Sequence, residues 1–166
     1  MKKRFLAVLL LAALLTLPGC GGEKQTTFQV GDKVETYWFQ FTVDQVKTTD
    51  RWMDYQPQEG DRLAVCYLTM DSTFSEAVPM NWADFVLRWG DGEEDRTYPI
   101  EYRGQEQLPD EYELVKGELR SGCLIFEVPQ DVDRARLIFQ ELFNEGDSDS
   151  AYTEGDTYTV DVDLPA

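Results

Sequence analysis

The segments Phe39-Gln-Phe-Thr-Val43 and Gly122-Cys-Leu-Ile-Phe-Glu-Val-Pro129 decide the fold class of this protein. In the first segment apolar and polar side chains alternate, which is typical of a β-strand with one buried face. In the second segment Leu124, Phe126 and Val128 would share one face of a strand, and Cys123, Ile125 and Glu127 would share the other. Both patterns predict β-structure.

Similar short segments recur along the chain between turn signals. Strands are expected at Leu63–Met70, Phe85–Trp89, Ala135–Phe143 and Thr157–Val162. Asp91-Gly92 predicts a hairpin turn, and Pro99 would interrupt the returning strand. The segment Ala135–Phe143 would also suit a helix, but its neighbours favour a strand. Seven or eight short strands predict an all-β fold, a two-sheet sandwich over residues 28–166.

The N-terminus has the pattern of an export signal. Lys2, Lys3 and Arg4 precede the uncharged 13-residue run Phe5–Leu17, which is shorter than the roughly 20 residues of a membrane-spanning helix. The segment Leu17-Pro-Gly-Cys20 resembles the lipobox of diacylated bacterial lipoproteins, although a smaller residue is commoner at Pro18. The resemblance implies a signal helix over residues 1–19 and a lipid on Cys20. The alternatives are an ordinary signal peptide and an uncleaved anchor.

A lipid on Cys20 would hold the protein at the extracellular face of the cell membrane, since two acyl chains form a stable anchor. Residues 20–27 are expected to form a flexible tether. The seven residues Gly21–Thr27 span at most about 25 Å. The folded domain would therefore lie close to the membrane, and a protein or glycan partner would meet it there.

Composition excludes several classes of function. Three of the 15 basic residues and none of the 32 acidic residues lie in the signal, so the mature chain has a net side-chain charge of −20. Such a charge repels nucleic acid and anionic lipid. The chain has no histidine, which excludes Ser-His-Asp and Cys-His catalysis, and too few cysteines for a Cys-rich zinc site. No cofactor is predicted.

Four segments occur in an order that resembles a known domain family: Gln29–Asp32, Tyr55–Gly60, Leu63–Met70 and Gly122–Pro129. The chain is similar over residues 28–140 to the telokin-like, immunoglobulin-like domain of unknown function that is common in lipoproteins of Gram-positive bacteria. The resemblance implies an immunoglobulin-like antiparallel β-sandwich on the extracellular side, with no established enzyme activity. Fold alone does not define a function.

The candidate site residues fall into three groups. Trp52 and Tyr55 lie in an expected loop, and exposed aromatic side chains favour ligand contact. Cys66 and Cys123 are interpreted as half-buried free thiols, with a disulfide as the alternative, because their expected faces differ. The acidic loop between Asn144 and Asp156 is interpreted as solvated; calcium binding there is the alternative, with Asp147, Asp149, Glu154 and Asp156 as its weak candidate ligands.

We therefore predict a membrane-anchored extracellular lipoprotein with a non-catalytic binding or envelope-associated module. The alternative is a calcium-linked structural surface domain, and a distant alternative is a carboxylate-dependent hydrolase. In such an acidic chain, a pair of suitably spaced carboxylates has little diagnostic value.

Metabolic labelling with palmitate tests the anchor. The wild-type protein should take up the label in the membrane fraction, and Cys20→Ser should remove it, because the thiol would be the only attachment point. Equal labelling of both proteins would contradict the lipobox interpretation.

Overall fold

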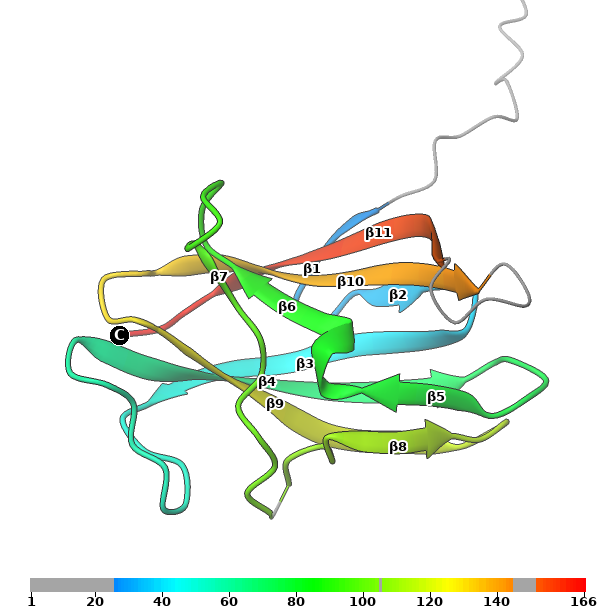
Figure 1. Ribbon diagram of the computed structural model, residues 1–166, viewed down its shortest axis with the longest axis horizontal. Coiled ribbons are helices and arrows are strands. Elements are labelled where there is room, and N and C mark those ends of the chain that lie inside the picture. The colour runs from blue at the N-terminus through cyan, green and yellow to red at the C-terminus, as the bar shows by residue number, and fades with distance from the viewer. Residues whose placement is uncertain (1–25, 105, 145–151) are drawn as a thin grey trace, which may run out of the picture.

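The computed structural model describes residues 26–104, 106–144 and 152–166, and these form two facing β-sheets and a smaller two-stranded sheet (Figure 1). The all-β sandwich prediction is confirmed. The upper sheet in Figure 1 has the strand order β1 (Thr27–Gln29), β11 (Tyr152–Asp163), β10 (Arg134–Asn144), β6 (Phe85–Arg88) and β7 (Arg96–Thr97). The other sheet has the order β2 (Lys33–Glu35), β3 (Phe39–Thr49), β4 (Asp61–Ser72) and β9 (Leu119–Pro129). The two-stranded sheet pairs β5 (Val78–Asn81) with β8 (Glu111–Leu114). A short 3₁₀ turn, η1 (Trp82–Asp84), joins β5 to β6.

The strands agree with the alternation of the sequence but are mostly longer than predicted. The ambiguous segment 135–143 lies within strand β10, and the Asp91-Gly92 turn joins β6 to β7. All the strand pairs are antiparallel except one: β1 pairs with β11 in parallel. The first strand starts at Thr27, so the described fold begins inside the segment expected to be a tether.

The main core lies between the two sheets. The faces predicted for β9 are correct, since Leu124, Phe126 and Val128 point into this core. The side chains of Phe39, Phe41, Phe85 and Phe139 form its aromatic centre, with ring centroids 5.0–6.2 Å apart. Burial of these rings is the dominant stabilising contribution that the fold offers.

A second apolar cluster lies on the opposite face of β4 and β9. Leu63, Val65, Cys123 and Ile125 are all buried there. The central residues of the two strands are therefore buried on both faces, a property that strict alternation does not predict.

Irregular chain covers the outer edge of β9 at residues 99–104 and 106–108. Ile100 N donates to Ile125 O at 2.7 Å, Leu108 N donates to Cys123 O at 2.9 Å, and Cys123 N donates to Glu106 O at 2.8 Å. These bonds occupy backbone groups that an edge strand would otherwise expose. We call residues 99–104 and 106–108 the edge strap.

The two described cysteines are free and lie on opposite faces of the same sheet. Cys66 is in the main core and Cys123 is in the second cluster. Burial raises the pKa of each thiol to about 12, so both stay protonated at neutral pH.

Several predicted features lie outside the described residues: the signal helix of residues 1–19, the lipid attachment at Cys20, and the candidate ligands Asp147 and Asp149. Over the remaining chain, no helix has the length and apolar character needed to cross a membrane.

Gly122 tests the packing of the edge strap on β9. A Cβ atom at this position would lie 2.7 Å from Leu108 Cδ2 and 3.0 Å from Glu106 O. Gly122→Ala should therefore lower the free energy of unfolding by about 1–3 kcal/mol in urea titrations. Leu108→Ala alone should lower the free energy of unfolding by about 2–5 kcal/mol.

The double variant is the control. The alanine at position 122 would occupy volume that Leu108 vacates. The double variant should therefore lose clearly less free energy of unfolding than the two single variants lose in sum. Additive losses would contradict the packing described here.

Candidate functional site

The predicted contact residues Trp52 and Tyr55 are half-buried, and ligand contact by them stays a prediction. Both rings pack against the second apolar cluster and shield it from solvent. The Tyr55 hydroxyl donates to the Glu127 carboxylate, and this bond, with burial, raises the pKa of Tyr55 to about 12. The two side chains therefore cover the outer face of β4 and β9.

The acidic loop is shorter than expected. Glu154 and Asp156 belong to strand β11, where the backbone pairs Leu142 with Glu154 and Phe143 with Thr153. Gly155 makes this pairing feasible, because a Cβ atom there would lie 2.4 Å from the Phe143 ring. Among the residues described, no group of three or more acidic or cysteine side chains is arranged to hold a metal ion. Calcium binding that involves Asp147 and Asp149 stays a prediction.

The structure brings four aromatic side chains together at one end of the sandwich. Tyr37, Trp38, Phe74 and Phe143 are called here the aromatic cluster. The Trp38 ring lies 4.7 Å from Tyr37, 4.8 Å from Phe74 and 5.3 Å from Phe143 between centroids. Tyr37 and Trp38 lie in the β2–β3 turn, Phe74 follows β4, and Phe143 lies on β10. None of the four is fully buried, and Tyr37 is 59% exposed. Rigid, partly exposed aromatic rings are the usual anchors of binding sites.

A groove of about 450 Å³ runs beside this cluster, between β10 and the β5 segment. Its lining is mainly apolar: Trp38, Phe39, Phe74, Ala77, Val78, Pro79, Met80, Phe139 and Leu142. Leu142 is 50% exposed at its rim. A groove of this size with an apolar lining is suited to hold a few side chains of a ligand.

The charged residues that line the groove are both acidic. Glu76 is exposed at the rim, and Asp84 is partly buried. Burial raises the pKa of Asp84 above its usual value, against the opposing effect of a hydrogen bond from Asn81 N, 2.7 Å from Asp84 Oδ2. That bond belongs to the capping box of η1, so the Asp84 carboxylate has a structural role. The groove therefore favours ligands that combine apolar groups with positive charge.

The buried side chain of Glu141 holds the aromatic cluster in place. Its buried carboxylate accepts hydrogen bonds from Tyr37 N at 2.6 Å, the Tyr158 hydroxyl at 3.0 Å and Asp156 N at 3.2 Å. The three donors come from the β2–β3 turn and from β11. One carboxylate thus joins the two sheets at the end where the groove lies, and charge-assisted bonds of this kind are the stronger ones.

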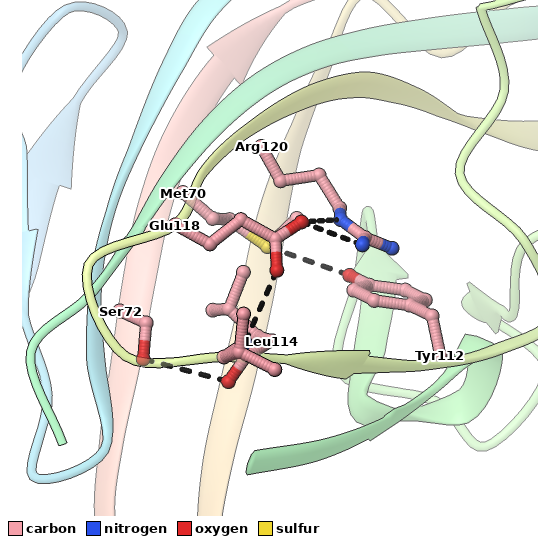
Figure 2. A network of polar contacts seen from close by, with 7 residues as sticks. Met70, Ser72, Tyr112, Leu114, Glu118 and Arg120 are labelled. Atoms are coloured by element: carbon pink, nitrogen blue, oxygen red, sulfur yellow. Dashed lines mark hydrogen bonds and ion pairs between the residues drawn. The ribbon is translucent and has the colours of Figure 1, made fainter. Parts of the chain in front are cut away.

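A second polar network holds β8 against β4 and β9 (Figure 2). Glu118 pairs with Arg120 at 2.5 Å and accepts from Val115 N at 3.1 Å; the Val115 bond and then Arg120 lower the pKa of Glu118. The Arg120 guanidinium lies 4.7 Å from the Tyr112 ring centre, and the Tyr112 hydroxyl contacts Met70 Sδ at 3.5 Å. Burial raises the pKa of Tyr112.

This network positions one wall of the groove. Tyr112 belongs to β8, and β8 pairs with β5 in the register Met80↔Tyr112. Ser72 N also donates to Glu118 O at 3.1 Å, and Gly117 N donates to Ser72 O at 3.1 Å. The β5 residues Val78, Pro79 and Met80 therefore line the groove on a two-stranded sheet that is fastened to the end of β4.

Sequence patterns did not identify the aromatic cluster, because its members lie as far apart as Tyr37 and Phe143 and meet only through sheet pairing. A partial signal was present. Tyr37-Trp38 precedes a strand, and Leu142-Phe143 follows the glutamate of an otherwise apolar strand.

A family model described as "Domain of unknown function (DUF4352)" matches residues 28–149. None of the curated proteins compared with the chain matches it.

Solved structures share the fold. The YjhA protein of Bacillus subtilis superposes with a TM-score of 0.61 at 16% identity, covering 83% of this chain and 99% of that chain. A "putative lipoprotein (ycdA)" from Bacillus subtilis gives 0.55 at 16% identity over 84% of this chain; the alignment spans only 39% of that protein. An "uncharacterized beta-sandwich protein" from Clostridium difficile gives 0.50 at 13% identity, covering 87% and 99% of the two chains.

Substitution of Glu141 tests whether its carboxylate joins the two sheets at the groove. Glu141→Gln should lower the free energy of unfolding by about 1.5–3 kcal/mol, because an amide replaces one acceptor with a donor that faces backbone N–H groups. Tyr158→Phe removes one of the three bonds and should cost about 1 kcal/mol. Glu154→Gln on β11 is the matched exposed control and should stay within about 0.5 kcal/mol of wild type. Equal losses for Glu141→Gln and Glu154→Gln would show that the carboxylate does not join the sheets.

Proposed function

Because the chain belongs to the DUF4352 family, a family defined without an activity, we propose its function from its groove and its N-terminus. The protein is a lipid-anchored module on the outer face of the membrane. It does not catalyse a reaction but binds a partner in the groove beside the aromatic cluster. The observation that carries the proposal is this groove, with its apolar lining and its two acidic side chains.

The anchor is supported by the signal pattern of residues 1–19 and by Cys20 at its end. YcdA, one of the proteins with the same fold, is described as a lipoprotein, which agrees with this placement. The domain would stand close to the membrane because its tether is short.

The unpaired edge of β10 indicates that the ligand is an extended polypeptide. Strand β6 pairs with β10 only from Arg136 to Phe139, so among the described residues Gln140–Asn144 have no strand on that side. The groove lies along this open edge and is closed on the other side by β5. An extended polypeptide can pair with a free strand edge while its alternate side chains fill an adjacent pocket.

The chemistry of the partner follows from the lining. Its apolar side chains would contact Trp38, Phe74 and Met80, and a basic side chain would face Glu76. The net charge of −20 on the mature chain would attract such a partner over a longer range. A glycan would use the aromatic rings but would leave the open edge of β10 unpaired.

A photo-cross-linking amino acid at Leu142 tests the proposal in the full-length protein in its own membrane. Leu142 is at the groove rim, whereas Leu119 is 70% exposed and is not among the groove residues, which makes it the matched control. Position 142 should form a discrete polypeptide adduct and position 119 should not. Glu76→Lys should weaken the adduct, and Glu59→Lys on a distant exposed loop should leave it unchanged. Similar adducts from both positions, or an adduct that Glu76→Lys leaves intact, would contradict the proposal.

A further inference from the structure

The outer face of the five-stranded sheet carries a row of directly opposed polar side chains. The register places Gln29 beside Asp161, Asp161 beside Arg136, Arg136 beside Arg88, and Arg88 beside Arg96. The row therefore crosses all five strands and ends in three adjacent arginines. Like charges directly opposite one another destabilise a sheet, so this arrangement is unfavourable for folding alone.

Basic side chains are scarce in this protein, which makes their clustering informative. The mature chain has 12 of them, and four lie on this face: Arg88, Arg96, Arg134 and Arg136. We call these four residues the arginine patch. Arg88, Arg134 and Arg136 line a surface trough of about 510 Å³, together with Gln29, Trp89, Asp161 and Asp163.

The acidic neighbours hold the arginine patch only weakly. Arg136 Nη2 lies 3.5 Å from Asp91 and Arg96 Nη2 lies 3.1 Å from Glu93. Both carboxylates are almost fully exposed on the β6–β7 loop, and pairs of this kind contribute little to stability. On the neighbouring strands, Arg134 pairs with Asp163 at 3.4 Å, and Asp161 accepts from the Gln29 amide.

Arg88 differs from its neighbours. It lies between Arg136 and Arg96, and its guanidinium makes no hydrogen bond or ion pair with the described part of the chain. A guanidinium presents five N–H donors that match the oxygens of a phosphate group. A phosphate over Arg88 would also relieve the repulsion between the three adjacent arginines.

The position of the patch in the fold indicates the source of that phosphate. The chain enters the domain at Thr27, the first residue of β1, which is the edge strand of this same sheet. A lipid on Cys20 would therefore keep the patch within a few tens of Å of the membrane surface. Tethering of this kind raises the effective concentration of the headgroups and offsets the repulsion expected from the net charge. At distances below the Debye length of about 8 Å, local charges decide the interaction.

We propose that the arginine patch binds the phosphate groups of anionic phospholipids in the membrane that carries the protein. The inference rests on the lipid anchor of the proposed function. It orients the domain so that its five-stranded sheet faces the bilayer.

Arginine modification by phenylglyoxal, located by mass spectrometry, tests the inference on the full-length acylated protein in vesicles. Arg88 and Arg136 should react about fivefold more slowly in vesicles containing phosphatidylglycerol than in phosphatidylcholine alone, the effect expected per basic side chain near an anionic surface. Arg51 and Arg103, exposed elsewhere, should react equally in both. High salt should remove the protection.

Each other outcome has a separate meaning. Failure of the protein to float with either vesicle would overturn the lipid anchor of the proposed function. Flotation with equal Arg88 reactivity in both vesicles would overturn the present inference alone. Protection by inorganic phosphate in phosphatidylcholine vesicles that matches the effect of phosphatidylglycerol would assign the site to a free anion and would also overturn it.

Discussion

The two-sided burial of β4 and β9 is the constraint on which the rest of the structure depends. Each strand has one face in the main core and the other in the second cluster, so a shift of register by one residue would exchange two apolar faces rather than an apolar and a polar one. The register must therefore be set from outside the pair. The edge strap sets it along β9 through Ile100, Glu106 and Leu108, and the bonds around Ser72 and Glu118 set it at the end of β4.

The position of strands β4 and β9 determines the shape of the groove. Its β5 wall is attached to β8, and β8 is fixed to β4 and β9 by the network of Glu118, Arg120 and Tyr112. Its β10 wall is fixed by Glu141, which lies at a bulge between Gln140 and Leu142 and whose carboxylate accepts from Tyr37 N and Asp156 N. Both walls thus end in buried or half-buried polar groups that are satisfied. Such a groove is formed before a ligand arrives, which reduces the entropy cost of binding.

Alternation predicted the strands and the inward face of β9 because a strand repeats every two residues and a sandwich buries one face of each sheet. It could not place Trp52 and Tyr55, because the outer face of β4 and β9 is covered by irregular segments that have no period. The prediction of free cysteines followed from the opposite faces of Cys66 and Cys123, and the structure has them on those faces. The aromatic cluster, Glu141 and the arginine row escaped detection because each joins residues from strands that are distant in sequence, and one sequence contains no information on which strands pair. The finer assignment to an immunoglobulin-like or telokin-like sandwich stays a prediction.

Strand β10 connects the two surfaces that the proposals involve. Arg134 and Arg136 lie near its start and Leu142 and Phe143 near its end, and the Cα atoms of Arg136 and Leu142, six positions apart, are separated by about 20 Å in an extended chain. The arginines point away from the core, and Phe139, which lies between Arg136 and Leu142 in the strand, points into it. A domain held to the bilayer through the arginine patch would thus hold its acidic, apolar groove at the far end of the same rigid strand. In this orientation four of the 12 basic residues of the mature chain would face the membrane, and the acidic excess would repel the other faces from it.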